Sequence, residues 1–139
     1  MLLRERMTTD VVTLGPDDAL VAADELMGLR GFRHLPVVDG EGHVVGLLNR
    51  VDMLRALVGA GALGARELLL QKSMMRVRDV MTRRVAVVDE DTPLVDVARR
   101  MRETRHSCLP VVREGVLVGL VTEADFVGVA LELLQGEKP

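Results

Sequence analysis

Strand-forming and helix-forming patterns alternate along the first half of the chain. Residues 11–14 are apolar or β-branched and end at turn residues, which predicts a strand. Pro16-Asp17-Asp18 predicts the start of a helix, and the apolar residues that follow recur at helical spacing, which predicts one buried helical face. That face contains Leu20, Ala23, Leu26 and Met27.

A hairpin and a closing helix complete this half. Strands are predicted at residues 35–38 and 44–48, and the turn-forming sequence Asp39-Gly40-Glu41-Gly42 between them favours a hairpin. Residues 51–58 predict a last helix. The first half therefore has the order β-α-β-β-α.

The second half repeats the first. Met7-Thr8 matches Met81-Thr82 at an offset of 74 residues, and the offset becomes 73 after one residue is lost from a turn. Leu-Pro-Val-Val at residues 35–38 recurs at residues 109–112, and Asp52 recurs as Asp125. Matched order and spacing of this kind indicate an internal duplication rather than chance.

The second copy predicts the same elements. Its first strand is expected at residues 85–88, and its helix is expected to start with Thr92 as the N-cap and Pro93 at the first helical position. A hairpin of residues 109–112 and 116–121 and a closing helix at 124–134 follow. The buried helical face contains Leu94, Val97 and Met101.

A linker separates the copies, which we place at residues 7–58 and 77–134. The linker, residues 59–76, opens with three glycines by residue 64, which predicts a flexible start, and continues with a connecting helix over residues 65–72. We expect a mixed α/β (α+β) fold in which the two motifs pack sheet to sheet with pseudo-two-fold symmetry, because neither half is large enough to be stable alone.

Composition excludes several functions. The 139 residues carry a net charge of -3, so no strong field favours nucleic acid or an acidic membrane surface. Two Phe, no Trp and no Tyr leave no aromatic platforms on which single-stranded bases could stack. The single Cys suits a reducing compartment, and the longest apolar stretch, residues 56–65, is too short to span a bilayer. We expect a cytoplasmic protein that binds neither nucleic acid nor membrane.

The duplicated motifs resemble a known family. Each copy opens with Met-Thr, carries a His/Cys-Leu-Pro-Val-Val strand and closes with a Gly-x-x-Thr-x-x-Asp pattern or a variant of it. In this order the motifs resemble a tandem pair of cystathionine-beta-synthase (CBS) domains, a Bateman module. The resemblance runs from Met7 to about Leu134, so we expect no attached enzyme or channel.

The resemblance implies a ligand and its site. Such pairs commonly bind adenosine-containing ligands, such as AMP, ADP, ATP or S-adenosylmethionine, in clefts between the copies, and the closing motif supplies an Asp for the ribose and a Ser or Thr beside it. The second copy matches with Thr122 and Asp125. A carboxylate can accept hydrogen bonds from two vicinal hydroxyls, and free N–H groups at a helix start favour phosphate.

The first copy departs from this pattern because Asn49 replaces the Ser or Thr, although Asp52 is kept. Asn can cap a helix and still donate to an oxygen. The alternative for both copies is structural. Thr122 and Asn49 are also ordinary N-caps, and Asp52 and Asp125 are ordinary acids of a first helical turn.

The family often places phosphate-binding groups just ahead of the Pro-Val-Val strand. The first copy offers Arg33 and His34, and the second offers Arg105, His106 and Ser107. Arg33 could contact phosphate through two nitrogens, or it could be a solvated turn residue. The base would lie against residues that are otherwise core, namely Val11, Val85, Leu35, Pro36, Leu109 and Pro110.

Catalytic and metal chemistry is not expected. Cys108 lies near His106, but no third group is visible to orient the histidine, and the strand around Cys108 predicts a buried, inert thiol. One Cys and three scattered His do not form a zinc site. The chain is therefore expected not to be an enzyme and to require no cofactor.

Two functions remain open. The first is a stand-alone sensor that binds an adenosine-containing ligand and signals to an effector protein. The second is a structural assembly module whose clefts are empty or degenerate. Both predict a homodimer, because the closing helices at residues 51–58 and 124–134 carry a largely apolar surface.

Overall fold

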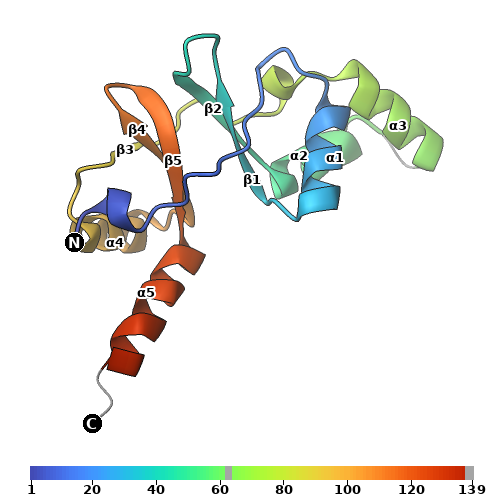
Figure 1. Ribbon diagram of the computed structural model, residues 1–139. Coiled ribbons are helices and arrows are strands. Elements are labelled where there is room, and N and C mark those ends of the chain that lie inside the picture. The colour runs from blue at the N-terminus through green and yellow to red at the C-terminus, as the bar shows by residue number, and fades with distance from the viewer. Residues whose placement is uncertain (62–63, 137–139) are drawn as a thin grey trace. The chain divides into compact units, whose positions relative to one another are not determined.

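The structure, a computed structural model, describes residues 1–61 and 64–136 and divides the chain into two compact units (Figure 1). The central unit is Val12–Val85. The terminal unit joins Met1–Val11 to the chain from Ala86 onward. Each unit contains a helix, a β-hairpin and a closing helix, so the mixed α/β class is confirmed.

The central unit is built around one hairpin. Strands β1 (His34–Val38) and β2 (Val44–Asn49) are antiparallel, and His34 lies opposite Asn49. The helices are α1 (Leu20–Arg30), α2 (Arg50–Gly59) and α3 (Ala65–Met74), and the short 3-10 helix η2 (Val77–Asp79) follows them. The core is formed by Leu14, Leu20, Ala23, Met27, Leu35, Val37, Leu48, Met53, Leu57 and Val77.

The terminal unit has a three-stranded sheet in the order β3-β4-β5. Strand β3 (Val88–Asp89) is parallel to β4 (Cys108–Arg113), and β4 is antiparallel to β5 (Val116–Thr122). The 3-10 helix η1 (Leu3–Glu5), α4 (Leu94–Thr104) and α5 (Glu123–Gly136) complete the unit, and α5 continues directly from β5 (Figure 1). The core is formed by Leu3, Val88, Leu94, Val97, Met101, Leu109, Val111 and Val121.

The Met-Thr segment of each copy lies on the hairpin of the other copy. Thr8 pairs with Leu120, with both N–O distances at 2.9 Å, and Thr82 pairs with Leu47 in the same way. A Cβ atom at Gly119 would lie 2.7 Å from the Met7 sulfur and 2.9 Å from the Thr8 carbonyl oxygen, so glycine allows this close crossing.

The predicted first strands were too long. Residues 11–14 form only a bridge from Leu14 to Val37, and the strand predicted at residues 85–88 is reduced to β3, Val88–Asp89. The hairpins, closing helices and connecting helix are confirmed. The flexible start predicted for the linker includes residues 62–63, which lie outside the described residues.

The predicted starts of the first helices were also wrong. Pro16-Asp17-Asp18 forms a turn in which the Gly15 amide donates to Asp18 Oδ2 (2.8 Å), and α1 begins at Leu20. Helix α4 begins at Leu94 with Pro93, rather than Thr92, as its N-cap. The physical reason is tertiary, because neighbouring backbone satisfies the first helical amides. The Leu20 amide donates to the Met75 carbonyl and the Leu94 amide to the Met1 carbonyl, each at 2.8 Å.

Candidate functional site

The terminal unit places Thr122 and Asp125 together at the junction of β5 and α5. The Thr122 backbone amide donates to Asp125 Oδ2 at 2.8 Å, and the Thr122 hydroxyl lies 3.4 Å from the same oxygen. The strand ends at Thr122 and the helix begins at Glu123, so the side chain of the third helical residue reaches back to the strand end. The proximity predicted from the three-residue spacing is therefore observed.

A second threonine contacts Asp125 from a distant part of the sequence. The Thr8 hydroxyl donates to Asp125 Oδ1 at 3.1 Å, across 117 residues of sequence. Sequence reasoning missed Thr8 as a site residue, although the repeated Met-Thr pair marked it as part of the motif. The missing information was that this segment lies on the hairpin of the other copy.

Strand β4 closes the other side of the junction. The Glu123 amide donates to the Ser107 carbonyl at 3.2 Å, which places Ser107 beside the start of α5. His106 is exposed just ahead of the strand, with Nδ1 2.7 Å from the Thr104 hydroxyl. Ser107 and His106 are therefore within the same unit as Asp125.

Cys108 lies opposite Thr122 in the hairpin and is buried, as predicted. Burial, and secondarily the nearby Asp125 carboxylate, raise the pKa of the Cys108 thiol to about 12. A thiol that stays protonated at neutral pH is a poor nucleophile and a poor metal ligand. The burial and the raised pKa both favour the unreactive thiol expected from the sequence.

The corresponding junction of the central unit is arranged differently. Asn49 Oδ1 accepts hydrogen bonds from the amides of Val51 (2.7 Å) and Asp52 (3.1 Å), so Asn49 is the N-cap of α2. The Asp52 carboxylate lies 3.9 Å from the Arg55 guanidinium, a contact within one helical turn. Asn49 thus satisfies the helix start itself, whereas in the terminal unit Asp125 satisfies the Thr122 amide.

Arg33 and His34 lie beside this junction. The Arg50 amide donates to the Arg33 carbonyl at 3.1 Å, and the Arg33 side chain is exposed. His34 is half-buried opposite Asn49, and burial followed by the Arg33 charge lowers the pKa of His34 below its ordinary value. Burial and the neighbouring Arg33 therefore disfavour the protonated form of His34.

The residues predicted to contact the base divide between core and surface. Leu35, Pro36, Leu109 and Pro110 are buried, whereas Val11 and Val85 are partly exposed. Val11 belongs to the unit that contains Asp125, and Val85 belongs to the unit that contains Asp52. Contact of these residues with a base stays a prediction.

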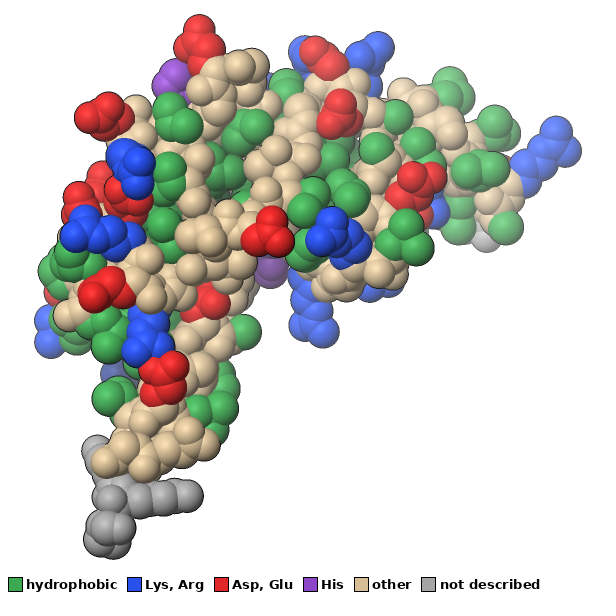
Figure 2. All heavy atoms as spheres, viewed as in Figure 1, with side chains coloured by type: hydrophobic (Ala, Val, Ile, Leu, Met, Phe, Trp, Pro, Cys, Tyr) green, Lys and Arg blue, Asp and Glu red, His purple; other side chains and the backbone are tan. Residues whose placement is uncertain are grey.

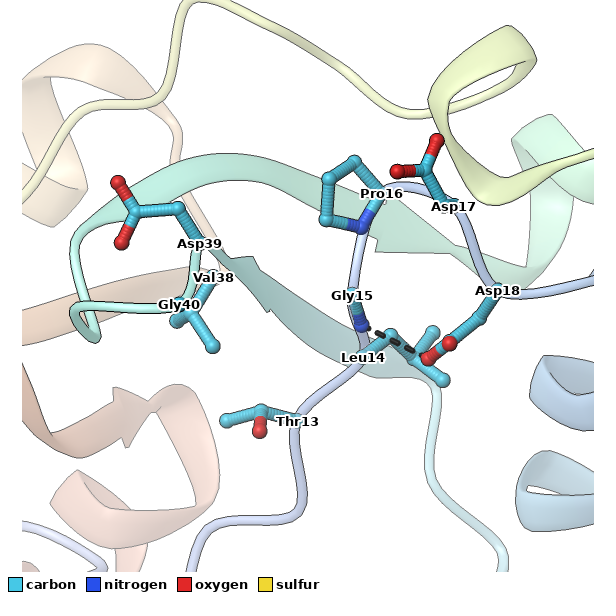
Figure 3. Close-up of a pocket in the computed structure, with 9 residues that line it drawn as sticks. All are labelled: Thr13, Leu14, Gly15, Pro16, Asp17, Asp18, Val38, Asp39 and Gly40. Atoms are coloured by element: carbon cyan, nitrogen blue, oxygen red, sulfur yellow. Dashed lines mark hydrogen bonds between the residues drawn. The ribbon is translucent and has the colours of Figure 1, made fainter.

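The central unit also has a surface pocket of about 560 Å³ that contains none of the predicted site residues (Figure 3). Three aspartates line it, and each has a partner. Asp17 pairs with Arg78, Asp18 accepts the Gly15 amide, and Asp39 accepts the amides of Glu41 and His43. These contacts hold the turns around the pocket.

Residues 1–61 and 64–136 contain neither a metal-binding cluster nor a membrane-spanning helix. No group of three or more His, Cys, Asp or Glu side chains there is arranged to hold a metal ion. The helices of the same residues all fall short of the length and apolar character needed to cross a membrane.

A family model supports the duplicated architecture. The model for the CBS domain matches residues 3–59 and again residues 77–132. Each match contains one hairpin, and the first contains all and the second most of the closing helix that follows it.

Solved structures with the same fold cover nearly the whole chain. A candidate acetoin utilization protein (AcuB) from Vibrio cholerae is 29% identical with a TM-score of 0.84, over 100% of this chain and 98% of its own. CBSX2, in complex with AMP, is 30% identical with a TM-score of 0.79, over 96% and 98%. The protein of that name is from Arabidopsis thaliana. The CBS domain pair of protein MJ0100, in complex with 5'-methylthioadenosine and S-adenosyl-L-methionine, is 26% identical with a TM-score of 0.75, over 99% and 98%.

Curated relatives differ in length. The chain spans 97% of a 26% identical relative from Dictyostelium discoideum, which is described as a CBS domain-containing protein. It spans only 32% of another relative, from Methanocaldococcus jannaschii. The match therefore concerns the paired motifs and not the activities of longer proteins.

Proposed function

This chain belongs to the CBS domain family, and from that premise we propose that it is a regulatory module that binds an adenosine-containing ligand and signals to a partner protein. The observation that carries the proposal is the junction of β5 and α5, where Asp125 and Thr122 lie within hydrogen-bond distance of each other. The proposed ligands are AMP, ADP, ATP and S-adenosylmethionine.

The chemistry of the junction suits a ribose. Thr122 and Thr8 donate to different oxygens of the Asp125 carboxylate. A carboxylate has about four lone-pair positions, and the Thr122 amide, the Thr122 hydroxyl and the Thr8 hydroxyl approach three of them. The 3.4 Å contact of the Thr122 hydroxyl is the longest of the three, so a ligand that displaces it leaves two positions for the vicinal hydroxyls of a ribose. Charge-assisted bonds of this kind are about twice as strong as neutral ones.

The phosphate or other ligand tail would lie at the helix starts. In the terminal unit the backbone amides of the first turn of α5, with Ser107 and His106 nearby, would favour an anion. In the central unit the Arg33 carbonyl accepts the Arg50 amide at the start of α2, and the exposed Arg33 side chain supplies a cation near this junction. Two of the similar structures hold adenosine-containing ligands, which supports this ligand class.

Calorimetric titration with AMP, ADP, ATP and S-adenosylmethionine tests the proposal. We expect binding heat with at least one compound. In Asp125→Asn, which keeps the shape of the side chain but removes its charge, the binding heat that comes from the terminal unit should be lost. Glu123→Gln is the matched control, because Glu123 is an exposed acid of the same helical turn. Absence of heat with all four compounds would refute adenosyl binding.

A second candidate function, assembly without ligand, is favoured by the surface of α5. The described part of this helix buries none of its residues, and its exposed side chains include Val127, Leu131, Leu133 and Leu134. Figure 2 shows hydrophobic side chains at the surface along α5. We propose homodimerisation through the closing helices, residues 51–58 and 124–134, and a dimer that binds none of the four compounds would favour assembly alone.

A further inference from the structure

The N-terminal segment of the chain reaches the proposed ligand site. Thr8 is held against β5 by two backbone hydrogen bonds to Leu120, and its hydroxyl donates to Asp125 Oδ1 at 3.1 Å. Thr122 donates to the other oxygen, Oδ2. The two carboxylate oxygens are therefore held by two different segments of the chain, one from each end.

The rest of the N-terminal segment is anchored on the same unit. Leu3 is fully buried, and its amide donates to the Thr92 carbonyl at 2.9 Å. Arg4 pairs with Asp91, and Arg6 pairs with Glu132 on α5. Residues 1–8 thus contact the strand before α5, the turn before α4 and α5 itself.

We propose that Thr8 is a positioning residue for the ligand: it orients the Asp125 carboxylate toward the ribose and so links ligand binding to the docking of the N-terminal segment. The inference rests on the proposed function and extends it to a residue outside the closing motif. A carboxylate fixed at both oxygens need not lose side-chain rotation when the ribose binds, so binding is stronger. Because linkage is reciprocal, a bound ligand also stabilises the docked segment.

The central unit supplies a matched comparison. Thr82 makes the same backbone pairing with Leu47 that Thr8 makes with Leu120. Among the described residues, however, Asp52 accepts no side-chain hydrogen bond from Thr82, and its carboxylate faces Arg55. The two threonines therefore share a backbone role, and only Thr8 has the additional contact with the aspartate.

The experiment measures AMP and 2'-deoxy-AMP affinity in an Asp52→Asn background, which removes the carboxylate of the central unit. Thr8→Val keeps the side-chain shape and removes the hydroxyl. We expect AMP affinity to fall about tenfold, as for loss of one hydrogen bond to a charged group, with a much smaller change for 2'-deoxy-AMP. Thr8→Ser should restore AMP affinity, and Thr82→Val should leave it unchanged.

Amide hydrogen exchange provides the second readout. In the protein with Thr8 intact, AMP should slow exchange at Leu3, Arg4 and Thr8, whose amides donate to Thr92, Glu90 and Leu120. In Thr8→Val this slowing should disappear.

Three results would overturn the inference. They are unchanged AMP affinity in Thr8→Val, an equal loss for AMP and 2'-deoxy-AMP together with a lower melting temperature, and failure of Thr8→Ser to restore binding. If the starting protein binds none of the adenosyl compounds, the proposed function falls as well, and that result is seen before any Thr8 variant is made.

Discussion

At the residue scale, a buried acid stabilises the terminal unit. Glu90 is only 5% exposed, and both of its carboxylate oxygens accept hydrogen bonds from Arg113. The Arg113 contact lowers the pKa of Glu90 below its ordinary value of 4.5. The ionised form is therefore the one that stabilises the fold, and its contribution is present above that ordinary value and is lost as the pH falls through the lowered pKa.

We expect Glu90→Gln to lower the melting temperature at neutral pH, because it leaves Arg113 without its charged partner. The difference from the unmodified protein should shrink as the pH falls below 4.5 and through the lowered pKa of Glu90, because Glu90 then becomes protonated. Melting curves across this pH range provide the measurement. Glu103→Gln, at an exposed position on α4, is the control and should have little effect at any pH. A pH-independent difference would contradict the role assigned to ionised Glu90.

Short-range geometry explains which site residues could be predicted from the sequence. Thr122 and Asp125 are three residues apart at a helix start, and helix geometry alone brings such side chains together. Thr8 is 117 residues from Asp125, and only the crossing of the Met-Thr segment over the other hairpin brings them into contact. The repeated Met-Thr pair indicated that Thr8 belongs to a motif, but it did not indicate that Thr8 contacts Asp125.

At the element scale, the two first helices end differently. Gly31 follows α1 as its C-cap with a φ of 71°, and Arg105 follows α4 as its C-cap with a φ of 59°. Both are left-handed conformations, which glycine adopts readily and a side chain disfavours. The C-terminal cap of α4 is therefore the more strained of the two.

Arg105→Gly should stabilise the protein by about 1 kcal/mol, because it removes the steric cost of the left-handed conformation. Gly31→Ala should have the opposite effect, by about 1 kcal/mol. Urea denaturation of both variants measures these changes. A destabilising Arg105→Gly would show that the arginine side chain makes a contribution larger than the backbone strain.

The exposed apolar surface of α5 predicts a homodimer, and a single charged substitution in that surface should prevent it. Leu131→Glu places a carboxylate in the apolar surface formed with Val127 and Leu134, so a dimer through this helix should dissociate. Light scattering at micromolar concentration should show a dimer for the unmodified protein and a monomer for the variant. Gln135→Glu, an exposed polar position on the same helix, should remain dimeric. A monomeric unmodified protein would contradict the prediction.

Elements were predictable where the sequence pattern is local. Alternating apolar residues around turn sequences correctly indicated both hairpins, and helical spacing correctly indicated the buried faces of α1 and α4. The helix starts were wrong because the amides of Leu20 and Leu94 bind carbonyls of Met75 and Met1, which are distant in sequence. Side-chain capping rules apply when no such backbone partner is present.

At the scale of the whole molecule, sequence order and structural units do not coincide. The duplication divides the sequence into a first and a second copy, whereas contacts group Met1–Val11 with the second copy. An internal repeat shows that two similar units exist. Long-range pairing determines which of the two units the Met1–Val11 segment joins. The residues before Val12 are therefore part of the second copy's structure.

Removal of residues 1–6, which leaves Met7 as the first residue, should selectively destabilise the terminal unit. Burial of Leu3 and the ion pairs of Arg4 and Arg6 would be lost. Leu3→Ala alone should cost about 2–5 kcal/mol, as expected for a fully buried leucine. Amide exchange should accelerate in β4 and β5 more than in β1 and β2, and equal acceleration in all four strands would contradict this assignment.

The pairing of Thr8 with Leu120 has a consequence for the order of events during synthesis on the ribosome. The central unit is continuous, so its residues can associate as soon as they have been made. The terminal unit must wait until β5 emerges, and residues 1–11 must meanwhile remain without their partner strand. Closing so long a loop costs more entropy than closing the local loops of the central unit. We therefore expect co-translational folding to begin in the central unit and to finish when residues 1–11 pair with the terminal unit.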